Sequence, residues 1–337
     1  MLSEKVINRT RPLQWVSDQI VLACVAIWMV ARAPRQYLRL VNGQIRLGTF
    51  PVRVADPRTA NEKFFWRKVL DHNPLFARIS DKQGAKEWIA ETGIAVECPK
   101  TLWVGTDLCQ LPDVIWSEPF YLKATHGWNT KISVTHTPED RSAIIAEATS
   151  FLTRQHGHHH LEWAYLEIPP RLMAERSVGA VDDMIEVKCF TYGPIVEFFL
   201  FLRRRPPGHG ARWDLVDDGK FHRCMLPTSV NDEVDMTPLP PMIDDLLAVA
   251  SQIGSRFDHM RVDFLTDGTD FYLGELTVYH NAGVVYRQGH LQDAHATRSW
   301  DLRQSWFMAA PQTGWRAVYA KALRRKITQR NAARLSV

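Results

Sequence analysis

The chain has 337 residues, of which 45% are hydrophobic and 23% are charged, and its formal net charge is +4. This composition is that of an ordinary globular protein and excludes a disordered or collagen-like chain. Its five cysteines are scattered, odd in number and without C-x-x-C spacing, which excludes a disulfide framework and a cysteine zinc site and favours the reducing cytoplasm.

The first 58 residues are predicted to form a basic extension with one short apolar helix. Residues 1–55 carry eight Lys or Arg against Glu4 and Asp18, and residues 20–31, IVLACVAIWMVA, are the only long apolar run. Twelve residues are too short to cross a bilayer unaided. We expect a helix that packs on the protein or on a partner, with contact to a membrane surface as the alternative.

The following segments alternate between helices and strands. Helical spacing predicts helices over 60–70 and 81–92, the second with Asp81 as its N-cap. Strands are expected near 94–105 and on both sides of the polar turn in FYLKATHGWNTKISV (120–134). A helix over 139–155 and a strand ending near Glu175 follow.

The second half of the chain has the patterns of antiparallel hairpins. MIEVKCFTYGPIVEFFLFLRR (184–204) alternates around a Tyr-Gly-Pro turn, and PMIDDLLAVASQIGSRF (241–257) has apolar residues at helical spacing. A second hairpin, RVDFLTDGTDFYLGELT (261–277), comes next. The tail, 302–337, has eight basic residues and no acid. We expect it to be a helix that packs on the domain or lies on anionic lipid; no nucleic-acid reading motif accompanies its charge.

This order of elements predicts an α+β fold rather than a doubly wound parallel sheet. The dinucleotide motif G-x-G-x-x-G and the P-loop motif G-x-x-x-x-G-K-[ST] are both absent. A nucleotide would therefore need a different kind of site. The run HGHHH (156–160) is interpreted as an exposed loop, because adjacent histidines cannot all enter one tetrahedral metal site.

Two carboxylates in the 261–277 hairpin stand at unusual positions. Asp263 and Glu275 lie mid-strand between apolar residues, where an unpaired buried charge is costly. Arg261 shares the strand face of Asp263 and could neutralise it. Alternatively, both carboxylates could bind Mg²⁺, which would leave Arg261 for a phosphate. The hairpin alone leaves both interpretations open.

Five segments in fixed order resemble one protein family. They are D-K at 81–82, Y-L-K-A-T-H-G at 121–127, P-P-R-L-M-A-E-R at 169–176, E-V-K-C-F at 186–190, and R-V-D with G-E-L-T at 261–263 and 274–277. Together they are similar to the ATP-grasp fold, in particular to its TupA-like branch, which is linked to bacterial surface polysaccharides. The resemblance covers about residues 60 to 285.

The resemblance implies antiparallel sheets with flanking helices and a nucleotide held between two α+β subdomains. It implies ATP and Mg²⁺ as cofactors. The segments it suggests are a 1–58 extension, a 59–118 N-terminal α/β subdomain, a 119–180 small subdomain with phosphate loop and hinge, a 181–301 large subdomain with the metal hairpin, and a 302–337 basic helix.

The family's functional residues carry over to matching positions. Those implied to hold the nucleotide are Lys82, Lys123, Thr125, His126, Gly127, Glu175, Val178, Glu186 and Lys188. Lys82, Lys123 and the Thr125–Gly127 turn match the phosphate site, Glu175 and Val178 the adenine hinge, and Glu186 the ribose acceptor. A Glu186–Lys188 ion pair is the structural alternative. The implied metal residues are Asp263, Glu275 and Thr277, and the implied catalytic residues are Arg261 and Lys123.

The implied activity is ATP-dependent carboxylate–amine ligation through an acyl phosphate, with a uronic-acid-type sugar or another carboxylate and an amine or amino acid as partners. Thr277, where the family has an amide, and a loop with one glycine depart from the family pattern. The alternatives are a glycosyltransferase-type polysaccharide enzyme and an inactive ATP-binding scaffold subunit. We expect a cytoplasmic protein that binds no nucleic acid, and leave contact with the inner membrane and homodimerisation open.

Overall fold

The computed structural model describes residues 2–135, 138, 140–179, 185–205, 208–218, 220–224, 233–234, 238–284 and 291–335. Its internal contacts group the chain into two units. The terminal unit combines Met1–Asn73 with Asn281–Val337, and the central unit is Pro74–His280. Both predicted terminal segments belong to the terminal unit; the predicted boundaries within the middle of the chain stay a prediction.

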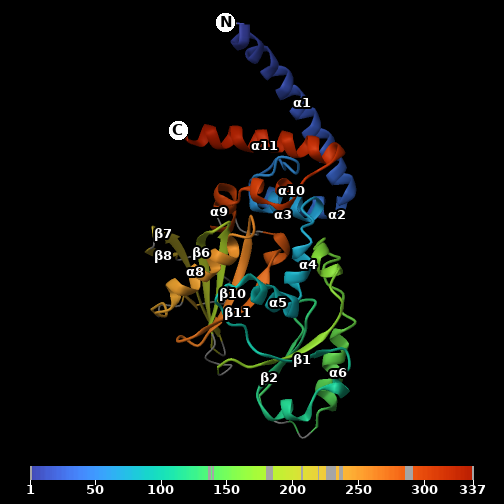
Figure 1. The fold of residues 1–337 in the computed structure, drawn as a ribbon, viewed down its shortest axis with the longest axis vertical. Helices are drawn as coiled ribbons and strands as arrows, with labels where there is room; N and C mark the ends of the chain where they lie inside the picture. Colours follow the sequence, from blue (N-terminus) through green and yellow to red (C-terminus); the bar gives the residue numbers. More distant parts are fainter. Residues whose placement is uncertain are drawn as a thin grey trace. The chain divides into compact units, whose positions relative to one another are not determined.

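The terminal unit is helical (Figure 1). Its helices are α1 (Leu2–Arg32), α2 (Pro34–Arg46), α3 (Ala60–Val69), α9 (Leu291–Ser299), α10 (Trp306–Ala309) and α11 (Gly314–Leu335), with a short 3-10 turn, η4, at Leu302–Gln304. The sequence predicted a short helix over the twelve-residue apolar run 20–31, whereas α1 has 31 residues. Its stretch Leu13–Arg32 has a mean hydropathy of 1.6 and is long and apolar enough, by length and composition alone, to cross a membrane.

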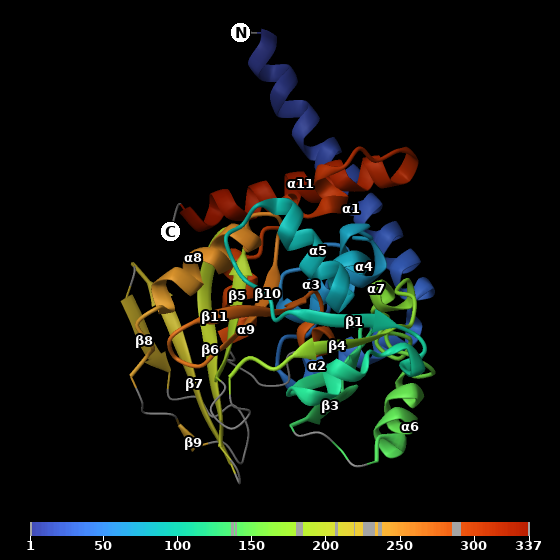
Figure 2. The same ribbon diagram turned by 60° about the horizontal axis from the view of Figure 1, so that its bottom comes forward.

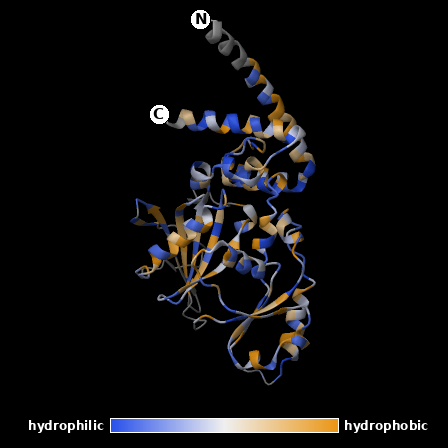
Figure 3. Cartoon of the chain, viewed as in Figure 1, coloured by the Kyte–Doolittle hydropathy of each residue, from blue (hydrophilic) through white to orange (hydrophobic). Residues whose placement is uncertain are grey.

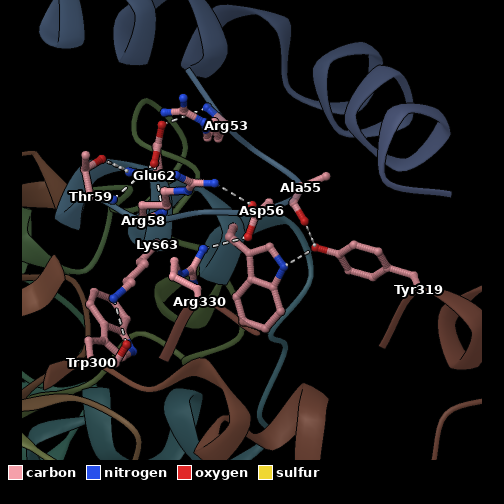
Figure 4. A network of polar contacts seen from close by, with 11 residues as sticks. Arg53, Ala55, Asp56, Arg58, Thr59, Glu62, Lys63, Trp300, Tyr319 and Arg330 are labelled. Atoms are coloured by element: carbon pink, nitrogen blue, oxygen red, sulfur yellow. Dashed lines mark hydrogen bonds and ion pairs between the residues drawn. The ribbon is translucent and has the colours of Figure 1, made fainter. Parts of the chain in front are cut away.

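Buried polar contacts join the two chain ends within the terminal unit (Figure 4). The Trp66 indole donates to the Tyr319 hydroxyl at 2.7 Å, and that hydroxyl donates to the Ala55 carbonyl at 3.0 Å. Glu62 accepts hydrogen bonds from the backbone N–H groups of Arg53 and Arg58 at 2.7 and 2.8 Å. Because Glu62 is fully buried, these bonds hold the segment 53–58 firmly against α3.

The first part of the central unit is a four-stranded antiparallel sheet of order β1-β4-β2-β3. Its strands are β1 (Thr101–Gly105), β2 (Phe120–Ala124), β3 (Lys131–Val134) and β4 (Leu172–Arg176). Helix α6 (Ser142–Phe151) packs on it through a core that includes Phe120, Leu122, Phe151 and Leu172. The helices α4 (Leu75–Ser80), α5 (Lys82–Thr92) and α7 (Trp163–Leu166) and the 3-10 turns η1 (Leu108–Gln110) and η2 (Asp113–Ser117) complete this part.

The second part of the central unit is a larger antiparallel sheet of order β11-β10-β5-β6-β7-β8 (Figure 2). Its strands are β5 (Ile185–Tyr192), β6 (Ile195–Arg205), β7 (Gly208–Asp217), β8 (Lys220–Cys224), β10 (Met260–Thr266) and β11 (Phe271–Thr277), and β9 (Glu233–Val234) pairs with β7. Helix α8 (Ile243–Gly254) packs on β5, β6 and β10 through its buried apolar face. A 3-10 turn, η3 (His280–Gly283), follows β11. The predicted α+β architecture with antiparallel sheets is confirmed.

Candidate active site

A cavity of about 370 Å³ in the central unit brings residues of both sheets together. Its lining comprises Lys82, Lys123, Gly127, Trp128, Asn129, Thr130, Lys131, Glu186, Lys188, Asp263, Phe264, Leu265, Gly274 and Glu275. Four lysines and three carboxylates therefore face one space. Such a mixed set can accept a polyanion and a divalent cation together, because lysines neutralise phosphate oxygens and carboxylates bind hard cations.

The carboxylates belong to neighbouring strands. In β10, Asp263 stands opposite Glu275 of β11 on one side and opposite Lys188 of β5 on the other. Arg261 donates twice to Asp263, from Nε and Nη2, both at 2.7 Å, and Lys188 Nζ donates to it at 3.1 Å. Burial alone would raise the pKa of Asp263, but these two cations outweigh it and hold the pKa below its usual range.

Glu275 differs from Asp263, because no hydrogen bond or ion pair engages its carboxylate within the described part of the chain. The carboxylate faces the cavity and lies close enough to Lys82 to favour the charged form of that lysine. Each interpretation of the hairpin therefore describes one of its carboxylates. Asp263 is paired with Arg261, and Glu275 faces the cavity, where it could bind a cation. Thr277 accepts a hydrogen bond from Arg261 at 3.0 Å.

The wall opposite the hairpin is built from the start of α5 and the loop after β2. Asp81 caps α5 by accepting from the backbone N–H of Gln83 at 2.9 Å, which fixes the first turn that carries Lys82. Lys82 Nζ donates to the Gly127 carbonyl, and burial lowers the pKa of this lysine. A Cβ on Gly127 would lie 2.2 Å from His156 Cδ2, so this loop position requires glycine.

Two lysines bind one buried carboxylate beside the cavity. Glu175 pairs with Lys123 of β2 and, at 2.5 Å, with Lys86 of α5. Burial favours the neutral form of Glu175, but the two lysines outweigh it and lower the pKa. Sequence reasoning missed Lys86, although its position one helical turn after Lys82 on the same helix face was a usable signal.

His126, in the loop after β2, packs against His156, with ring centroids 5.8 Å apart. Burial first, and then the nearby charges of His126, Lys82 and Arg154, lower the pKa of His156 to about 4. Both rings therefore belong to the scaffold of the loop, and HGHHH is a turn whose first histidine is half-buried rather than exposed.

The lowered pKa of His156 predicts that the folded protein loses stability in acid. An unfolded histidine binds a proton near pH 6.5, whereas folded His156 does so only near pH 4. The unfolded state therefore holds more protons between these values, and stability must fall as the pH falls from about 6.5 to about 4. Urea denaturation at several pH values in this range should show that the free energy of unfolding falls. In His156→Gln the free energy of unfolding should depend less on pH. His158→Gln, in the exposed part of the same run, should not; equal profiles for both variants would contradict the assignment.

The structure brings together most of the predicted residues. Those that line the cavity are Lys82, Lys123, Gly127, Glu186, Lys188, Asp263 and Glu275. Glu175, Arg261 and Thr277 lie one contact behind them. Thr125 and His126 are buried and do not line the cavity, and half-buried Val178 does not line it either. The alternative Glu186–Lys188 ion pair is present at 2.8 Å.

Trp128, Asn129, Thr130 and Lys131 were missed as lining residues. They follow Gly127 directly, so the loop itself was the available signal. Each of these roles toward a nucleotide stays a prediction.

The residues present fit Mg²⁺ bound together with a phosphate chain. Among the described residues, no three His, Cys, Asp or Glu side chains gather as a protein-only metal site. Mg²⁺ commonly takes only one or two protein carboxylates and completes its shell with phosphate oxygens and water. Asp263 and Glu275 supply such a pair, and Lys82 and Lys123 face the same cavity.

A model of the family described as TupA-like ATPgrasp matches residues 62–295. The chain belongs to the TupA-like ATP-grasp family. The predicted resemblance is thereby confirmed, as are the fold class and the choice of ATP and Mg²⁺ as cofactors. No curated protein matches this TupA-like chain.

Solved structures with a similar fold are ATP-grasp ligases. D-alanine–D-alanine ligase from Bacillus anthracis, complexed with ATP, is 15% identical over 59% of this chain and 55% of its own, with a TM-score of 0.36. L-amino acid ligase from Bacillus licheniformis is 14% identical over 72% and 55%, with a TM-score of 0.41. The ATP-grasp ligase PsnB, complexed with its minimal precursor, is 9% identical over 76% and 63%, with a TM-score of 0.37. The TupA-like chain thus spans about 55% of the length of the two Bacillus ligases.

Proposed function

We propose that this protein is an ATP-dependent carboxylate–amine ligase of the cytoplasm. One observation carries the proposal: the carboxylate of Glu275, which makes no hydrogen bond or ion pair with any described residue, lines one cavity together with Lys82 and Lys123. This arrangement supplies a cation ligand on one wall and phosphate ligands on the other. The reaction class is supported by membership of the ATP-grasp family.

Bound Mg·ATP would supply the phosphoryl group that activates a carboxylate. In the proposed chemistry, a substrate carboxylate oxygen attacks the γ-phosphorus and releases ADP. An amine nitrogen then attacks the resulting acyl phosphate, forms the C–N bond, and releases phosphate and a proton. Lys82 and Lys123 would bind phosphate oxygens, and Asp263 and Glu275 would hold the cation. Together they would stabilise the charge that moves onto the leaving oxygens in a partly buried site.

We further propose that the carboxylate belongs to a uronic-acid-type sugar of a surface polysaccharide or its precursor, and that the amine is an amino acid or another small amine. This finer assignment is supported only by the polysaccharide link of the TupA-like branch, whose motifs occur at 169–176 and 186–190.

The test is hydroxylamine trapping. The purified chain is incubated with ATP, Mg²⁺, hydroxylamine and a panel of uronates and other carboxylates. A ligase converts the correct carboxylate into a hydroxamate, with one ADP and one phosphate formed for each product molecule. Consumption of a nucleotide sugar instead of ATP would establish the glycosyltransferase alternative. Nucleotide binding without any turnover by the folded protein, across the panel, would favour the scaffold alternative.

A further inference from the structure

Hydrophobic residues recur along α1 (Figure 3), and many of their side chains are exposed. One face of the helix packs inward through Leu22, Val25 and Met29, all buried. The opposite face carries Leu13, Ile20 and Ile27, which are 74%, 58% and 71% exposed. We call Leu13, Val16, Ile20, Ile27 and Trp28 the apolar stripe. Only 22% of the apolar stretch of α1 is buried, so this surface is too large to be explained as scattered exposed residues.

Helix α11 packs against α1 and places basic side chains beside it. Trp315 contacts Trp28 with ring centroids 4.9 Å apart, and Lys326 Nζ lies 5.5 Å from the Trp15 ring centroid. Arg325 binds the buried Asp18 at 2.9 Å through Nε. The two helices are therefore held together along much of their length. A membrane-spanning α1 would draw the basic α11 into hydrocarbon, which is costly, so this geometry favours a helix that lies in the interface plane.

A cavity of about 960 Å³ opens between α1, α11 and the segment 52–58. Its apolar wall includes Leu22, Ala26, Ile27 and Val30, and Ile27 also belongs to the apolar stripe. The cavity is thus continuous with the exposed face of α1.

The opposite wall of this cavity is cationic. It carries Arg53, Arg58, Lys326 and Arg330 against a single acid, Asp56. Asp56 is already bound by Arg330 at 2.8 Å and by Arg58 at 3.2 Å. In the described part of the chain, Arg53 makes no ion pair with a carboxylate. Lys326 makes none either, although its charge helps to lower the pKa of Asp18 after the larger effect of Arg325. Two cations thus remain available for an anion at the mouth of an apolar cavity.

We propose that the terminal unit docks on an anionic bilayer and that this cavity holds the phosphate head group of an anionic phospholipid. The head group meets Arg53 and Lys326, and the acyl chains leave past Ile27 along the apolar stripe. A free phosphate ion would leave the apolar wall and the stripe uncovered. A second copy of the chain on this surface would bring two basic α11 helices together, and their positive charges would repel each other. This inference goes beyond the proposed ligase activity and does not depend on it.

The experiment is co-sedimentation of the full chain with vesicles of phosphatidylcholine, with and without phosphatidylglycerol. We expect binding that requires phosphatidylglycerol and weakens with salt. The double variant Arg53→Gln/Lys326→Gln should weaken it about 30-fold, since each basic side chain near an anionic surface contributes about fivefold. Lys100→Gln/Lys220→Gln removes the same charge from exposed positions of the central unit and should bind normally.

A second variant tests the apolar stripe. Ile27→Ser changes an exposed side chain, so the melting temperature should be preserved while vesicle binding falls. Glycerol 3-phosphate at the same concentration as the phosphatidylglycerol of the vesicles should not displace the wild-type protein, because it offers no acyl chain. Displacement by it would show a free-phosphate site and overturn the proposal. The proposal would also be overturned if the folded protein did not sediment with the vesicles. It would be overturned as well if the wild-type protein formed a dimer that Ile27→Ser abolished.

Discussion

Replacing Glu275 with glutamine is expected to reduce Mg²⁺-dependent ATP turnover by at least about 100-fold without a change in melting temperature. The amide keeps the shape of the side chain but removes the negative charge that the cation needs. The substitution breaks no hydrogen bond or ion pair in the described part of the chain, and only the longer-range attraction between Glu275 and Lys82 is lost. The measurement is ADP release at saturating ATP, paired with thermal melting monitored by circular dichroism.

The matched control for Glu275 lies in the same hairpin. Asp270→Asn removes a carboxylate from the exposed turn between β10 and β11, away from the cavity lining. Its turnover should equal that of the wild type. Normal turnover by the Glu275 variant would remove this residue from the metal site and return the hairpin to the Arg261–Asp263 ion pair alone.

Lys123→Met is the second substitution with a large expected effect. We expect the affinity for a non-hydrolysable ATP analogue with Mg²⁺ to fall about 100-fold, because a phosphate loses a charged ligand in a partly buried site. The fold should persist, since Glu175 keeps its ion pair with Lys86. Calorimetric titration of folded protein measures the loss directly.

Lys86→Met is the control that distinguishes direct phosphate binding by Lys123 from its ion pair with Glu175. It also removes one of the two cations bound to Glu175, but Lys86 does not line the cavity. Its affinity for the analogue should stay within about threefold of the wild type, in the range of an indirect effect. If both variants lost affinity equally, Glu175 neutralisation rather than direct phosphate contact would explain the role of Lys123.

Local patterns predicted the elements well where period and turn chemistry agree. The 261–277 hairpin was predicted because its strands flank an Asp-Gly turn. The 184–204 hairpin was predicted because its residues alternate around a Tyr-Gly-Pro turn, and the structure has strands at Ile185–Tyr192 and Ile195–Arg205. The partner of Asp263 on its other side could not be predicted. Lys188 lies 75 positions earlier in the chain, and only the pairing of β5 with β10 brings it within 3.1 Å.

The length of α1 escaped the same reasoning for a physical reason. The apolar run 20–31 was measured as a continuous block, whereas the helix continues through Leu13, Trp15 and Val16 between polar neighbours. A helix tolerates such interruptions because neighbouring residues point to different faces. Likewise, the cluster of Lys86, Glu175 and Lys123 joins α5, β4 and β2, and no single segment contains its pattern.

The discontinuous make-up of the terminal unit sets the order in which its parts meet during synthesis. The Trp66–Tyr319 hydrogen bond closes over 253 positions, and the entire central unit lies between its partners. A chain that emerges from the ribosome therefore completes both sheets before α11 exists, and domains generally fold as units in that order. Until then, α1 lacks its contacts with α11, among them that of Trp28 with Trp315, so the newly made chain exposes more apolar surface on α1 than the finished protein does.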